Sequence, residues 1–146
     1  MKSFIVHSLR SSANLLIILC FIMSSVELKL RPDVIVHWEN YHIRYFDTCV
    51  KETGVDPMIP RTMLRQINLP DEESFHCYLK CIFQYNHMLT PDGKDIDYDA
   101  FGADIHVTPE VLKVCRELGG TESEICRKTY LVAKCTIDDK VNSSGR

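Results

Sequence analysis

The sequence predicts an all-α domain of six helices that disulfides hold together. Apolar residues recur at intervals of three or four along most of the chain, and no segment alternates well enough to make a strand. Seven cysteines in 146 residues indicate either disulfides in a secreted protein or the ligands of a metal. Neither a repeat nor a linker divides the chain, so we expect one domain.

The N-terminal segment, residues 1–25, is typical of a secretory signal peptide. Two basic residues precede an apolar run of about ten residues, and two small serines follow it. A membrane-spanning helix needs about twenty apolar residues, so a transmembrane anchor is the weaker interpretation. Cleavage removes Cys20 and leaves six cysteines, an even number that suits an oxidising compartment. We therefore expect a secreted, extracellular protein with a mature domain over 26–146.

The first three helices are predicted from apolar spacing and end signals. Aromatic residues recur at intervals of three or four residues over 33–52, which predicts a first helix that ends before Gly54. After a turn at Pro57, the segment 60–67 is expected to form two helical turns. The third helix, 71–89, begins with acidic residues that favour the positive end of a helix dipole. Its apolar arc of about 200° predicts a central position in the fold.

The last three helices follow a turn in the middle of the chain. The segment 97–103 is predicted as a short, weaker helix. Thr108 followed by Pro109 is a strong start signal, because the hydroxyl can cap the helix and proline lacks an N–H that would go unpaired. Glycine ends this helix at Gly119, and the final helix is expected over about 122–138.

Charge and motifs exclude several classes of function. Removal of the signal peptide leaves 15 basic and 20 acidic residues, a net charge of −5, which argues against binding to nucleic acid. Cys77, Cys81 and His87 lack the converging turns of a zinc site, and a calcium loop from Asp95 lacks its glycine and glutamate. No Gly-x-Ser-x-Gly motif supports a hydrolase. We expect no enzyme, metal, cofactor or stable membrane association.

Helix geometry restricts the pairing of the six cysteines, which could pair in fifteen ways. Cys77 and Cys81 lie one turn apart on the same predicted helix face, so a bridge between them would distort the helix. Cys126 and Cys135 lie nine residues apart in one predicted helix, about 13 Å, which is beyond disulfide reach. Ten pairings remain open.

The cysteine spacing resembles that of a known family. The intervals from Cys49 onward are 27, 3, 33, 10 and 8 residues, and the intervals of 3 and 8 are the most diagnostic. This pattern resembles that of the insect odorant-binding proteins of the pheromone-binding and general odorant-binding group, and the resemblance spans the mature chain. It implies six helices around an internal apolar cavity. It also implies three bridges, which are Cys49–Cys81, Cys77–Cys126 and Cys115–Cys135.

The resemblance implies a carrier that binds small hydrophobic odorants or pheromones and moves them through aqueous lymph to chemosensory receptors. Fourteen apolar residues are candidates to line the cavity, with ordinary core packing as the alternative for each: Met63, Leu64, Ile67, Phe75, Tyr78, Leu79, Ile82, Phe83, Phe101, Val111, Val114, Leu118, Tyr130 and Val132. The two tyrosine hydroxyls are the candidates to bind a polar head. The alternative function is a secreted, disulfide-stapled helical effector that acts by surface contact without a small-molecule ligand.

One histidine, His106, is a candidate for a pH-dependent release of the bound ligand. His106 lies in the loop before Thr108, and its protonation would place charge beside Ile105 and Val107. If those residues close the cavity, the charge would favour an open state. The alternative is that the histidines are solvated and titrate without consequence. His76 falls on the polar face of its predicted helix and is expected to be exposed.

Overall fold

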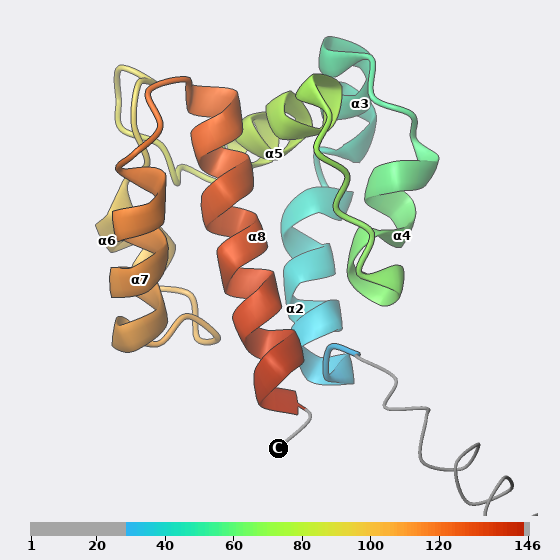
Figure 1. The fold of residues 1–146 in the computed structure, drawn as a ribbon. Coiled ribbons are helices and arrows are strands. Elements are labelled where there is room, and N and C mark those ends of the chain that lie inside the picture. The colour runs from blue at the N-terminus through green and yellow to red at the C-terminus, as the bar shows by residue number, and fades with distance from the viewer. Residues whose placement is uncertain (1–28, 145–146) are drawn as a thin grey trace, which may run out of the picture.

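The computed structural model describes residues 29–144 and folds them into seven helices (Figure 1). In chain order these are α2 (Pro32–Ile43), α3 (Phe46–Thr53), α4 (Met58–Gln66), α5 (Glu73–Tyr85), α6 (Tyr98–Gly102), α7 (Pro109–Gly119) and α8 (Ile125–Ser144). The predicted all-α class is confirmed. No helix between residues 29 and 144 is long and apolar enough to cross a membrane. The expected signal peptide lies outside the described residues.

The number of helices was underpredicted because the expected helix 33–52 is two helices. The chain leaves helical geometry at Tyr45, whose φ and ψ are −115° and 9°. The Tyr45 ring stacks on Tyr85 of α5, with ring centroids 4.9 Å apart. The chain changes direction here between α2 and α3, and the Cys49–Cys81 bridge joins α3 to α5. Residue spacing alone did not reveal the break, because the aromatic periodicity runs through it.

The central helix α5 ends four residues earlier than predicted. His87 adopts a left-handed conformation with φ of 57°, and the Met88 N–H donates back to the Phe83 carbonyl at 2.8 Å. Leu89 then forms an isolated antiparallel bridge with Ile96. Met88 and Leu89 are buried even though they lie outside the helix. The apolar pattern therefore continued beyond the helix that it predicted.

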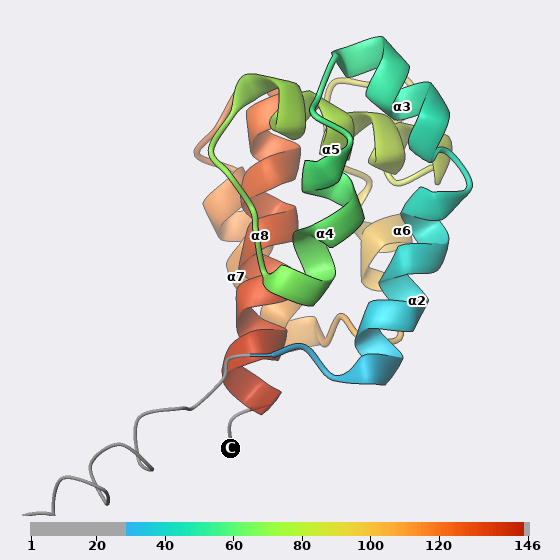
Figure 2. The same ribbon diagram turned by 90° about the vertical axis from the view of Figure 1, so that its right-hand side faces the viewer.

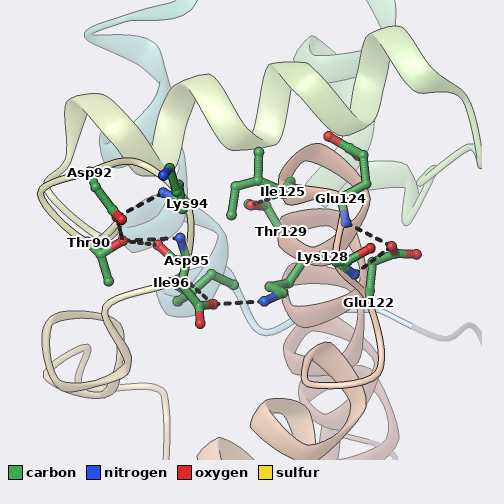
Figure 3. Close-up of polar contacts among 11 residues, drawn as sticks. Thr90, Asp92, Lys94, Asp95, Ile96, Glu122, Glu124, Ile125, Lys128 and Thr129 are labelled. Carbon is green, nitrogen blue, oxygen red and sulfur yellow. Dashed lines mark hydrogen bonds and ion pairs between the residues drawn. The ribbon is translucent and has the colours of Figure 1, made fainter.

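The turn between Leu89 and Ile96 uses its polar residues to hold itself against α8 (Figure 3). The Thr90 hydroxyl donates to the Asp92 carboxylate at 2.7 Å and accepts from the Asp95 N–H at 3.1 Å. The Asp95 carboxylate lies 3.0 Å from Lys128 Nζ at the start of α8. The Asp92 carboxylate thus accepts a hydrogen bond within the turn, and the Asp95 carboxylate links the turn to α8 through Lys128.

Helix α7 lies antiparallel and close to α8 (Figure 1). It begins as predicted, with Thr108 Oγ1 accepting from the N–H of Val111 at 3.4 Å and Pro109 in the first turn. Its last residue, Gly119, permits the close approach. A Cβ atom there would lie 2.6 Å from a methyl group of Val132 in α8. A larger residue at this position would push the two helices apart.

Helix α8 extends six residues past its predicted end at Asp138. Val141 is buried, so the inward-facing side of the helix continues beyond that point. Lys134 and Asp138 form an ion pair one turn apart at 2.6 Å, which supports the helix across the predicted end. The polar residues of the C-terminal segment led to an early end in the prediction, whereas the helix continues and buries Val141 in the core.

His76 is buried, which corrects the expectation that it is exposed. Its ring packs on Tyr130 of α8 with centroids 4.2 Å apart, and its Nε2 lies 2.9 Å from Asp71 Oδ1. The side of α5 that the helical wheel marks as polar is covered at this point by the beginning of α8. A wheel describes one helix and takes no account of a neighbour that covers it.

Three disulfides divide the helices into two groups. The bridges are Cys49–Cys81, Cys77–Cys126 and Cys115–Cys135, the three pairs that the family resemblance implies. They join α3 to α5, α5 to α8, and α7 to α8, and we call these four helices the stapled frame. Helices α2, α4 and α6 contain no cysteine, and we call them the cover. The frame is constrained covalently, whereas the cover is held by packing and polar contacts alone.

Candidate functional site

An apolar cavity of about 90 Å³ lies between the stapled frame and the cover. The frame contributes Leu79, Ile82, Phe83, Ala133, Thr136 and Ile137. The cover contributes Trp38, Tyr41, His42, Met63, Leu64 and Phe101, and the connecting segments contribute Met88, Asp104 and Val107. Figure 2 shows α4 in front of the space between α8 and α2. The cavity therefore has one covalently stapled wall and one wall without disulfides.

Six of the fourteen predicted ligand contacts line this cavity, namely Met63, Leu64, Leu79, Ile82, Phe83 and Phe101. Their contact with a ligand remains a prediction. Phe75, Tyr78, Tyr130 and Val132 are buried in the core without reaching the cavity, and Ile67 and Val111 pack against the core from its edge. The inward placement of Val114 and Leu118 was wrong, because they are 60% and 43% exposed on the outer face of α7.

The cavity wall also contains residues that the sequence did not assign to it. Trp38 and Tyr41 belong to the aromatic face that predicted the first helix, and Ala133 and Ile137 to the inward face of the last. Asp104 comes from the loop between α6 and α7, near Val107, which the hypothesis on His106 had already placed at the cavity. The amphipathic pattern marks the helical residues as inward-facing. It carries no signal that distinguishes a cavity wall from a filled core.

The Asp104 carboxylate is the centre of a polar cluster at one side of the cavity. Its Oδ2 accepts from Trp38 Nε1 at 3.3 Å and lies 3.1 Å from His37 Nε2. Its Oδ1 accepts from the backbone N–H of His106 at 2.7 Å. Burial, followed by the charge of Asp104 and a hydrogen bond to it, raises the pKa of the Tyr41 hydroxyl. The buried carboxylate thus joins α2 to the loop between α6 and α7.

His106, the predicted pH sensor, lies at the edge of this cluster. Its ring is 4.9 Å from the ring of His37 and 6.1 Å from that of Trp38, measured between centroids. Val107 is buried and lines the cavity, as the hypothesis requires. Ile105 is 78% exposed and does not line it, so this part of the premise was wrong. A positive charge on His106 would therefore affect the cavity wall through the neighbouring His37 ring and through Val107.

The two predicted tyrosine anchors have protein partners of their own. The Tyr130 hydroxyl donates to the Leu69 carbonyl at 3.1 Å. The Tyr78 hydroxyl lies 3.4 Å from Nδ1 of His42, and burial raises the pKa of this tyrosine far above its usual value. His42 does line the cavity, and burial lowers the pKa of its imidazole. The tyrosine hydroxyls therefore do not face the cavity, whereas the histidine does.

Comparisons with known proteins agree with this architecture. The model of the PBP/GOBP family matches residues 41–139, which include all six paired cysteines. General odorant-binding protein 99b of Drosophila melanogaster is 31% identical over 81 residues, covering 49% of this chain and 54% of that relative. The chain thus spans about half the length of this relative. Odorant binding protein 5 of Apis mellifera superposes with a TM-score of 0.54 at 19% identity, covering 77% of this chain and 93% of the bee protein, and is similar in fold.

Proposed function

Because the chain belongs to the PBP/GOBP family of insect odorant-binding proteins, which are non-enzymatic carriers, we propose that it binds and transports small hydrophobic odorants or pheromones. The observation that carries the proposal is the apolar cavity between the stapled frame and the cover. Apolar walls with few polar groups suit a hydrophobic molecule with one polar function. Transport through aqueous lymph would end at a chemosensory receptor, the partner that this role requires.

Secretion is part of the proposal. Three disulfides persist in oxidising compartments such as the extracellular space, and the signal peptide expected at residues 1–25 supplies the route. A stapled frame also tolerates an unfilled centre, because each bridge restricts the unfolded chain and contributes about 2 to 4 kcal/mol to stability.

The size of the cavity means that a ligand must widen it. A volume of about 90 Å³ holds about three water molecules, whereas ligand sites usually occupy about 300 to 1,000 Å³. The cover is the wall that can move, because α2, α4 and α6 lack disulfides. An ion pair between Arg65 and Glu39, at 2.6 Å, links α4 to α2, and the flexible side chains of Met63 and Met88 line the space. We propose that the ligand enters by displacing the cover from the frame.

A displacement assay tests the carrier role. Delipidated protein is loaded with N-phenyl-1-naphthylamine and titrated with alcohols, esters, aldehydes and fatty acids of graded chain length. We expect reversible displacement by neutral hydrophobic compounds of about ten to twenty heavy atoms, with affinities of about micromolar order. Absence of probe binding and of displacement by any compound would contradict the proposal and favour the surface effector.

A pair of variants locates the binding in the cavity. Ala133→Leu adds three carbons to the cavity wall and is expected to weaken binding of the probe and of every ligand. Val114→Leu adds one carbon on the exposed face of α7 and serves as the control with unchanged affinity. Equal affinities in the two variants would show that the ligand binds elsewhere.

A further inference from the structure

Asn142 begins a triplet, Asn142-Ser143-Ser144, that has the acceptor sequence of N-linked glycosylation. This sequence consists of asparagine, any residue except proline, and then serine or threonine. Neither serine nor threonine stands two positions after any of the other asparagines, which are Asn14, Asn40, Asn68 and Asn86. The sequence therefore contains one acceptor triplet.

The last turn of α8 presents this triplet to solvent. Helix α8 continues to Ser144, and its last buried residue is Val141. All three side chains of the triplet are exposed. Figure 1 shows this end of α8 at the periphery of the molecule. A glycan is bulky and hydrated, so it fits only where its asparagine faces water. The folded protein thus has room for a glycan on Asn142.

Asn142 also points away from the ligand cavity. Helix α8 contributes Ala133, Thr136 and Ile137 to the cavity wall. At about 100° per residue, Asn142 lies about 180° from Ala133 and about 140° from Ile137 around the helix axis. A glycan at this position would therefore leave the cavity free.

The helical conformation of the triplet is no barrier to its modification. A glycosyltransferase needs an extended triplet, in which the asparagine amide and the hydroxyl of the third residue can meet. In α8 the Ser143 and Ser144 hydroxyls donate to carbonyls one turn earlier, both at 2.7 Å. Unwinding this turn exchanges such hydrogen bonds for bonds to water and exposes no buried side chain, so it costs little free energy.

We propose that Asn142 carries an N-linked glycan in the secreted protein. The donor is an oligosaccharide that pyrophosphate links to a membrane lipid, and an oligosaccharyltransferase of the secretory pathway catalyses the transfer. The Asn142 side-chain nitrogen forms a bond to C1 of the first N-acetylglucosamine and loses one proton to a base of the transferase. The bond from C1 to the pyrophosphate oxygen breaks, and the lipid pyrophosphate leaves with its electron pair. This inference rests on the secretion that is part of the proposed function.

The two serines of the triplet provide matched variants. Each hydroxyl is exposed and makes the same type of contact within α8, so replacing either serine by alanine should change stability to the same small extent. Only the third residue belongs to the acceptor sequence. Ser144→Ala is therefore expected to abolish the glycan, whereas Ser143→Ala and Ser144→Thr are expected to retain it.

Expression of the full chain in insect cells tests the proposal. Protein from the medium is treated with peptide:N-glycosidase A, which removes an N-glycan and converts its asparagine to aspartate. We expect the mass of the unmodified sequence to fall by that of one glycan, and peptide mass spectrometry to find the conversion at Asn142. Unglycosylated Asn142 in all of the secreted protein, or a glycan that persists in Ser144→Ala, would overturn the inference.

The outcomes separate this inference from the function on which it rests. Secreted protein without a glycan would refute the modification and leave the carrier function intact. Protein that stays in the cells with residues 1–25 attached and no glycan would refute secretion, and the inference with it. Asn142→Gln is expected to bind N-phenyl-1-naphthylamine as tightly as the unmodified sequence does. Loss of probe binding in this variant, with the fold intact by circular dichroism, would contradict the placement of the glycan away from the cavity.

Discussion

His37 Nε2 lies 3.1 Å from the Asp104 carboxylate and thereby joins α2 to a loop 67 residues further along the chain. The carboxylate is buried and also accepts from Trp38 and from the His106 backbone. No disulfide reaches α2. This polar cluster therefore fixes α2, one helix of the cover, against the loop between α6 and α7.

Replacing the carboxylate with an amide tests this role. Asp104→Asn replaces one carboxylate oxygen with an NH₂ group, which then faces either His37 and Trp38 or the His106 N–H, and we expect the free energy of unfolding to fall by about 1 to 3 kcal/mol. Urea denaturation followed by circular dichroism measures the change. Asp99→Asn, at an exposed position of α6, is the matched control, expected to change stability by less than about 0.5 kcal/mol. Equal stabilities of the two variants would contradict the structural role of the cluster.

Ligand binding is predicted to weaken between pH 7 and pH 5. The rings of His37 and His106 lie 4.9 Å apart, so positive charges on both would repel each other beside the cavity wall. The Asp104 carboxylate attracts a charge on His37, and the Asp33 carboxylate attracts one on His106, but the two rings still face each other. His106→Gln should therefore reduce the pH difference in the displacement assay.

The control for the pH effect is His87→Asn, since His87 is exposed and asparagine tolerates its left-handed backbone. We expect this variant to keep the full pH dependence. Equal ligand affinity of the unmodified protein at pH 5 and pH 7, with the fold intact, would rule out a pH-dependent release.

Protein stability is predicted to fall as the pH drops below about 6.5, the ordinary pKa of histidine. Burial lowers the pKa of His42 in the folded state, so the unfolded chain takes up the proton first. Stability is then present above pH 6.5 and is lost as the pH falls towards the pKa of the folded state. Urea denaturation at pH 7.5 and pH 5.5 should show a smaller difference for His42→Gln than for the unmodified protein. An unchanged difference would show that other groups cause the loss.

Hydrogen exchange should distinguish the cover from the frame. We expect amides of α2 and α4 to exchange faster than those of α5 and α8, because no disulfide restrains the first pair. A bound ligand such as decan-2-one should add protection mainly in α2 and α4. Uniform exchange in the free protein, or protection confined to α5 and α8, would contradict a moving cover.

Several elements of the fold follow from interactions that are local in the sequence. Thr108 and Pro109 begin α7 as predicted, because a capping hydroxyl and a proline in the first turn act within a few residues. Cys77 and Cys81 lie on α5, and Cys126 and Cys135 on α8, as their spacing within predicted helices implied. The cysteine intervals also identified the family.

The sequence by itself thus determined the all-α class, the cysteine pattern and the apolar face of most helices, because periodicity and capping act over one or two turns. Tertiary structure decided the break before α3, where Tyr45 meets Tyr85, and the burial of His76 beneath α8. It also decided that Leu79 lines the cavity while Val114 faces solvent. Periodicity defines which side of a helix is apolar. Whether that side meets a neighbour, a cavity or water depends on where the other helices lie.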